Sequence, residues 1–138
     1  MKKFGFKLQK VLDMRRHREE EAKIELGRAI SILTEIENNI IRNAEIRRNA
    51  AAERFASAAS AAAIISWDHY IQRLAMEAEK LMSDAAQAEL TVEEKRGQYL
   101  EASRELKVLE KLKEKQEQEY RRESFAAATA ELDDLWRG

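Results

Sequence analysis

The chain has 138 residues, of which 37% are charged and 7% aromatic, and its 25 basic residues almost balance its 26 acidic ones. This length allows one domain, and the composition is typical of coiled coils and long helices rather than of layered globular folds. Balanced charge argues against nucleic acid as a partner, because duplex-binding proteins present a basic face. The lack of cysteine excludes disulfides and thiol chemistry. No apolar run is long enough to span a bilayer.

The first 18 residues are basic, with seven lysines and arginines against the single Asp13. They lack the continuous apolar core of a secretory signal, although a mitochondrial presequence or a membrane-surface helix has a similar composition. We interpret them as the basic end of a long helix, because a seven-residue repeat that begins at Leu8 continues unbroken into acidic sequence.

Mostly small and apolar residues recur at alternating steps of three and four through most of the chain, with a charged residue at three of these positions and no proline between them. The repeat comprises Leu8, Leu12, Arg15, Glu19, Ala22, Leu26, Ala29, Leu33, Ile36 and Ile40, and then Ile71, Leu74, Ala78, Leu81, Ala85, Ala88, Val92, Lys95, Tyr99, Ala102, Leu106 and Leu109. Two helices that wind around each other need such a repeat to keep a shared seam. A chain of this kind has no obvious pocket, so the pattern predicts that its function lies in binding partners. Ile24, Ile41, Leu90 and Leu100 fall outside the seam and are predicted to face solvent or other proteins.

The alanine-rich stretch from Ala50 to Ser66 is where the repeat loses its large residues and serines appear. Ser66 can cap a helix that starts at Trp67, with Asp68 in its positive first turn. We therefore predict an all-α fold, a single coiled-coil domain over residues 1–138 that forms a long antiparallel two-helix hairpin. Its first helix covers about residues 4–58, its turn about 59–66 and its second helix about 67–136. The alternative is a single unbroken helix that pairs in a parallel dimer.

A turn centred near Ala62 places Phe4 opposite about Tyr120, so residues 121–138 have no partner within the chain. This segment, which we call the overhang, has a stripe of its own at Phe125, Ala128, Leu132 and Leu135. Such an overhang is either frayed or bound to another molecule.

Residues for catalysis are not arranged in any familiar pattern. The four glycines form no phosphate-binding loop, and the Glu-x-x-His pairs of di-iron bundles are missing, since Met14 precedes His17 and Ser66 precedes His69 at that spacing. The sequence therefore predicts no enzyme, no cofactor and no metal site.

Four segments, in this order, resemble the FliJ family of flagellar export proteins. They are Phe6-x-Leu8-x-x-Val11-Leu12-Asp13-x-Arg15 with Glu19-Glu20-x-Ala22-x-x-x-Leu26-x-x-Ala29, then Trp67-x-x-Tyr70-Ile71-x-x-Leu74, then Leu109 to Lys115 with Tyr120, and finally Glu131-Leu132-Asp133-Asp134. The resemblance covers most of the chain, and the length also fits the family.

The resemblance implies a cytoplasmic component of a type III export apparatus, flagellar or injectisome, at the cytoplasmic face of the inner membrane. Such a protein is shaped like the stalk of rotary ATPases and binds a hexameric export ATPase, promoting its assembly and hydrolysis. It also contacts the export-gate membrane protein and escorts export chaperones, and no stable homo-oligomer is expected. The competing function is a structural homodimeric spacer or a membrane-surface scaffold that uses the basic N-terminus.

A stalk needs a ring-facing end whose charges can meet several equivalent subunits, and the same resemblance points to residues for the gate contact. The end that meets the ATPase is expected to use Lys7, Lys10, Arg15, Arg16, Lys111, Lys113, Lys115, Leu132 and Leu135. The gate contact is expected at Ile40, Tyr70 and Leu74. Aromatic residues that some members carry on the facing part of the first helix are absent here, where Ile40, Asn43 and Arg47 stand instead.

Overall fold

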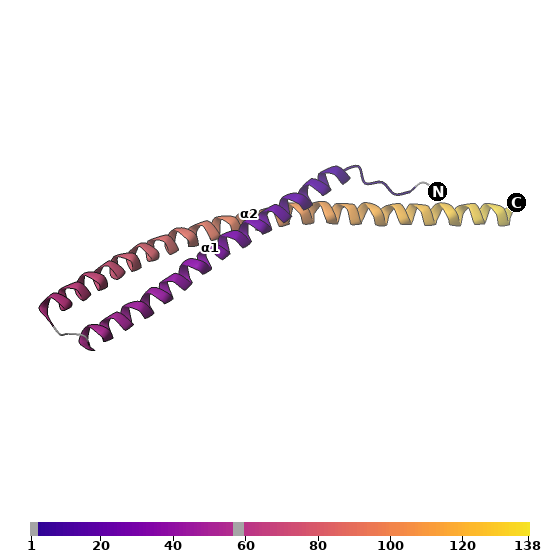
Figure 1. Cartoon of the computed structure of the whole chain (residues 1–138). Coiled ribbons are helices and arrows are strands. Elements are labelled where there is room, and N and C mark those ends of the chain that lie inside the picture. The colour runs from indigo at the N-terminus through magenta and orange to yellow at the C-terminus, as the bar shows by residue number, and fades with distance from the viewer. Residues whose placement is uncertain (1–2, 57–59) are drawn as a thin grey trace. The chain divides into compact units, whose positions relative to one another are not determined.

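Two long helices form a hairpin in the computed structural model, which describes residues 3–56 and 60–138. Helix α1 spans Gln9–Ala56 and helix α2 spans Ala61–Arg137, and the described residues contain no strand (Figure 1). The helices pack against each other in antiparallel directions, which confirms the predicted all-α hairpin. The alternative of one unbroken helix is wrong, because α1 ends at Ala56 and a new helix begins at Ala61.

The chain divides into two compact units. The terminal unit comprises Met1–Lys23 with Gln98–Gly138, and the turn unit comprises Ile24–Gly97. Each unit contains a stretch of α1 and a stretch of α2 packed side by side, so each has its own section of the seam.

The predicted seam is confirmed with one exception. Every predicted position from Leu12 to Ile40 and from Ile71 to Leu109 is buried or half-buried. Leu8 is 39% exposed, because it precedes the first residue of α1 and therefore does not share the phase of the helical repeat. The seam also continues past Ile40 through three positions beyond the predicted repeat, namely Asn43, Arg47 and Ala50.

Helix α2 begins six residues earlier than predicted, at Ala61 rather than at Trp67. Ser60, not Ser66, is the cap: its Oγ accepts the N–H of Ala63 at 3.2 Å, and its carbonyl accepts the N–H of Ile64 at 3.2 Å. Three alanines follow Ser60, and alanine has the highest helix propensity of all residues, so nothing delays the helix until Trp67. The predicted end of the first helix near residue 58 and the start of the turn at residue 59 lie outside the described residues.

Helix α1 begins at Gln9, five residues later than predicted, and the residues just before it form a short non-helical segment. The carbonyl of Phe6 accepts the N–H of Gln9 at 3.0 Å in the turn that starts the helix. The ring of Phe4 still reaches Tyr120, with ring centroids 5.7 Å apart, which confirms the predicted pairing. Phe6, Leu12 and Leu106 form the core of the terminal unit, with Phe4, Leu109 and Leu112 packed against it.

Candidate protein-interaction sites

The overhang is the most exposed helical segment of the terminal unit. Beyond Tyr120, helix α2 continues to Arg137, and every residue of this segment except the half-buried Ser124 is exposed (Figure 1). Its alanines favour the helix without a packing partner, and the hydroxyl of Thr129 donates to the carbonyl of Phe125 at 2.9 Å. The predicted absence of a partner within the chain is confirmed for these residues.

Four large apolar side chains of the overhang are exposed: Phe125 (75%), Leu132 (57%), Leu135 (77%) and Trp136 (88%). Spacings of three and four residues place Phe125, Leu132 and Leu135 on one face of the helix, with Trp136 at its edge. A contiguous apolar face on an otherwise charged protein is typical of a surface that binds another protein.

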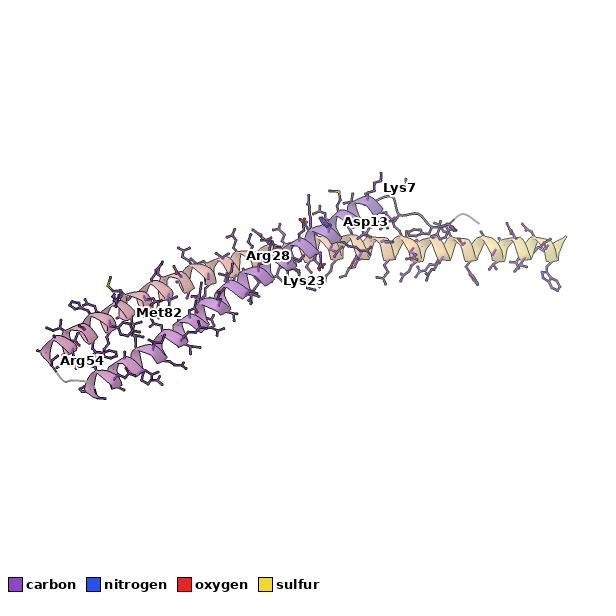
Figure 2. The ribbon with its side chains drawn as sticks, viewed as in Figure 1. Lys7, Asp13, Lys23, Arg28, Arg54 and Met82 are labelled. Carbon is purple, nitrogen blue, oxygen red and sulfur yellow. The ribbon has the colours of Figure 1, made fainter. Side chains whose placement is uncertain are left out.

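The basic residues predicted to meet the ATPase divide into two groups. Lys7, Lys10, Lys111 and Lys115 are exposed and form no ion pair among the described residues, and Lys7 points away from the helix pair (Figure 2). The other three, Arg15, Arg16 and Lys113, already interact within the chain. The four lysines are therefore the predicted basic residues that remain available to a partner.

Arg15, Arg16 and Lys113 contact polar groups of the terminal unit itself. Arg15 is half-buried and forms an ion pair with Glu105 of the other helix. Lys113 donates to Oε1 of Gln9 at 2.8 Å, and Arg16 lies 3.8 Å from Glu110. These residues join the two helices. With Leu132 and Leu135, all nine residues predicted for the ATPase contact lie in the terminal unit.

The three residues predicted for the gate contact lie in the turn unit, and they differ in accessibility. Tyr70 is 36% exposed, with the indole of Trp67 edge-on at 6.0 Å and the guanidinium of Arg73 at 5.8 Å from its ring. Ile40 is half-buried in the seam. Leu74 is only 7% exposed, so its side chain belongs to the core and is not presented to a partner.

Two shallow grooves, each of about 210 Å³, run beside the seam of the turn unit and were not anticipated from the sequence. One is lined by Ile46, Asn49, Ala50, Glu53, Trp67 and Tyr70, and the other by Asn39, Arg42, Asn43, Ile46, Glu77 and Leu81. Ile46 lines both grooves. Tyr70 therefore stands at the edge of a surface that combines apolar, amide and charged side chains.

The turn unit also buries a polar residue in its seam. Asn43 is 4% exposed, and its Nδ2 donates to the carbonyl of Leu74 at 3.1 Å. Its Oδ1 and the Nε of Arg47 are buried without a hydrogen-bond partner among the described residues. Continuing the steps of three and four from Ile40 would have placed both residues in the seam.

The described part of the chain holds no group of three or more residues that could bind a metal ion. His17 lies 3.0 Å from Glu21 on an exposed face of α1. In residues 3–56 and 60–138, neither helix is long and apolar enough to cross a membrane.

These features define a helical hairpin whose exposed faces are suited to binding other proteins. A family model described as "FliJ: Flagellar FliJ protein" matches residues 3–136, and the chain belongs to this family. The family consists of non-catalytic flagellar proteins associated with export. Neither the curated proteins nor the solved structures contain a match to the chain.

Proposed function

We propose that this protein is the coiled-coil stalk of the flagellar export apparatus, and that its terminal unit binds the hexameric export ATPase and promotes its assembly and hydrolysis. The observation that carries the proposal is the overhang, an exposed helix with a contiguous apolar face next to a group of exposed lysines. A helix of this kind can be inserted between subunits that surround it, because its apolar face gains contacts on burial.

The lysines contribute differently from the apolar face. Lys7, Lys10, Lys111 and Lys115 are solvated, so their attraction to acidic groups of a partner is screened by salt. Charges of this kind orient and accelerate association more than they strengthen it. We therefore assign the affinity mainly to Leu132, Leu135 and Phe125, and the association rate mainly to the lysines.

The turn unit is proposed to contact the export-gate membrane protein, which would link the ATPase to the channel at the cytoplasmic face of the membrane. The support for this step is the groove beside Trp67 and Tyr70, which offers aromatic rings and the amide of Asn49 on one surface. Of the three residues predicted for this contact, Tyr70 can touch the partner directly, and the half-buried Ile40 can do so only with its exposed atoms. Leu74 is buried in the core and supports this surface without touching the partner. Export chaperones are proposed as further partners of the exposed aliphatic residues Ile24, Ile41, Leu90 and Leu100.

The test is ATP hydrolysis by the cognate export ATPase with and without this protein. We expect the unmodified protein to stimulate hydrolysis. The triple variant Phe125→Ala, Leu132→Ala and Leu135→Ala should raise the concentration needed for half-maximal stimulation at least about tenfold, since buried apolar anchors dominate protein interfaces. The matched control replaces three exposed apolar residues of the turn unit with alanine, Met76, Met82 and Leu90. Equal stimulation by both triple variants would remove the overhang from the contact, and no stimulation by the unmodified protein would contradict the proposed function.

A charge test separates the lysines from the apolar face. Lys7→Glu with Lys10→Glu should reduce stimulation about two- to fivefold at low salt and have little effect at high salt, because exposed charges are screened. Circular dichroism checks that the helices are retained. A loss that persists at high salt would show that these lysines do more than steer association.

A further inference from the structure

The connection between the two helices is short and contains neither glycine nor proline. Helix α1 ends at Ala56 and α2 begins at Ala61, so only four residues separate them. These four are serines and alanines, and no glycine or proline lies between Gly27 and Gly97. Alanine has the highest helix propensity of all residues, whereas glycine and proline interrupt helices most strongly. The local sequence therefore specifies the hairpin only weakly.

The helix ends at this connection are also weakly capped. The first N–H groups of a helix and its last carbonyls have no partner within that helix. Among the described residues, the Oγ of Ser60 accepts one of these groups, the N–H of Ala63, at 3.2 Å. The first turn of α2 has no acidic residue to favour its positive end, and Arg54 in the last turn of α1 is paired with Asp68. A helix that ran through the connection would pair these backbone groups with each other.

The helical repeat does not stop at the connection. Beyond Ala50, steps of three and four lead through Arg54, Ser57, Ala61, Ile64, Trp67 and Ile71, with one step of three where four is expected. In the hairpin Ile64, Trp67 and Ile71 are half-buried, whereas Ala61 is exposed. Coiled coils accommodate a single irregularity of this kind by a local change in winding. A continuous helix would therefore carry the seam positions of both α1 and α2 along one face.

We propose that the hairpin opens and pairs with a second opened copy of this chain in an antiparallel, domain-swapped dimer. Helix α1 of each copy then packs against α2 of the other, so the seam contacts of the hairpin form between copies. Arg15 of one copy meets Glu105 of the other, and Asn43 donates to the carbonyl of Leu74. Exchange of identical elements gives a dimer without any new complementary surface.

The contacts across the seam fit the twofold axis that such a dimer requires. Gln9 and Lys113, which are hydrogen-bonded, lie equally far along the sequence on either side of Ala61, and so do Arg54 and Asp68. The axis of the dimer therefore passes near Ala61, where two small side chains face each other and let the helices approach closely. A parallel dimer would instead place α1 beside α1 and would lose these contacts.

The hairpin remains the form in dilute solution. A connection of four residues holds α1 beside its own α2 at an effective concentration in the millimolar range, so a second chain competes only near about 1 mM. Because both forms share one seam, conversion requires the helices to separate, and a dimer once formed should persist on dilution. Each terminal unit then contains Met1–Lys23 of one copy and Gln98–Gly138 of the other. The inference does not depend on the proposed ATPase contact.

Refolding of the full chain from urea tests the inference. After refolding at about 1 mM, size-exclusion chromatography with light scattering should show a dimer beside the 16.0 kDa monomer, whereas refolding at about 10 µM should give almost only monomer. Ser60→Ala should raise the dimerisation constant at least about fivefold, because it removes a cap that only the hairpin needs. A monomer at every refolding concentration would overturn the proposal.

Two double-glycine variants test the role of the connection. Ala58→Gly with Ala59→Gly should lower the dimerisation constant at least about fivefold, because glycine opposes a helix that joins α1 to α2. The matched control, Ala51→Gly with Ala52→Gly, changes exposed residues inside α1, which is helical in both forms, and should leave the constant unchanged. Equal effects of the two variants would contradict a continuous helix in the dimer.

Cross-linking tests the exchange itself, since the chain has no cysteine of its own. Gln9→Cys and Lys113→Cys are made in separate chains, because the side chains of these residues meet across the seam. When the two variants are refolded together, a short bis-maleimide should link one to the other and neither to itself. Linkage of Gln9→Cys to itself would indicate a parallel pair, and linkage after mixing the folded variants would indicate association of closed hairpins. Either result would contradict the exchange.

Discussion

The terminal unit and the turn unit use the same helical repeat but build different cores with it. The terminal unit buries large side chains, Phe6, Leu12 and Leu106, and joins its helices through the ion pair of Arg15 with Glu105. The turn unit buries mostly small residues, with Ala29, Ala50, Ala85, Ala88 and Val92 in its core beside Leu74 and the amide of Asn43. A heptad pattern therefore predicts where the seam runs but not what stabilises it.

The difference has consequences for binding. Large core residues gain free energy from the area they bury, so the terminal unit can hold its helices together while nearly all residues after Tyr120 stay exposed. Small core residues let the helices approach closely but bury less area each. In the turn unit this leaves shallow grooves along the seam, one of which is lined by Trp67 and Tyr70.

The largest expected effect tests the large-residue core. Replacing the fully buried Leu12 with alanine should lower the free energy of unfolding by about 2 to 5 kcal/mol, since it removes buried methyl groups and leaves a cavity. Urea unfolding followed by far-UV circular dichroism measures it. The matched control is Leu90→Ala at an exposed position, with an expected change below about 0.5 kcal/mol. A similar small loss for Leu12→Ala would mean that the terminal unit does not depend on this cluster.

The next effect has the opposite sign and belongs to the turn unit. Asn43→Leu should raise the free energy of unfolding by about 1 to 2 kcal/mol, because it removes a buried acceptor that has no partner among the described residues and adds an apolar side chain to the seam. Thermal unfolding provides the measurement, with Asn38→Leu at an exposed position as the control. Destabilisation by Asn43→Leu would show that the hydrogen bond to the carbonyl of Leu74 outweighs the unpaired oxygen.

The helix start in the turn unit gives a smaller effect. Ser60→Ala should cost about 1 kcal/mol, because it removes the acceptor for the N–H of Ala63. Ser66→Ala should cost nothing, because this residue lies inside α2 and alanine has the higher helix propensity. Chemical unfolding of both variants compares the two serines directly, and the reverse order would restore Ser66 as the cap.

The smallest effect compares one kind of interaction in both units. A double-mutant cycle on Arg15 and Glu105 should give a coupling energy of about 0.5 to 1 kcal/mol. The same cycle on Arg54 and Asp68, whose charged atoms lie 2.7 Å apart near the turn, should give about 0.3 kcal/mol. The less exposed carboxylate of Glu105, compared with that of Asp68, and the neighbouring apolar cluster favour the first pair. Both couplings should decrease with salt, and a larger coupling at Arg54 would contradict this difference between the units.

Much of the fold was predictable because helical periodicity is a local property. Leu12, Leu74 and Leu106 could be placed in the seam from their spacing alone, and the pairing of Phe4 with Tyr120 followed from the position of the turn. The turn itself was less well predicted. Ser60 and Ser66 are both suitable caps, and local sequence does not decide between two caps that each precede helix-forming residues.

The candidate sites were predictable only in part. Leu132 and Leu135 are exposed because no segment of the first helix faces them. Counting the residues on each side of the turn is enough to predict this. The contacts of Arg15 with Glu105 and of Lys113 with Gln9 cannot be predicted in this way, because they depend on which side chains of the other helix lie within reach.

By itself, the sequence determined the class of fold, the position of the seam, the unpaired overhang and the family, because each depends on residue type and spacing along one helix. Only the tertiary structure decided that Ser60 caps α2, that Asn43 is buried with an oxygen unpaired among the described residues and that a groove forms beside Tyr70. These features depend on how closely two helices approach and on which groups they bring together. The distance between the two helices is set by how the side chains of both pack together, so the sequence of one helix does not determine it alone.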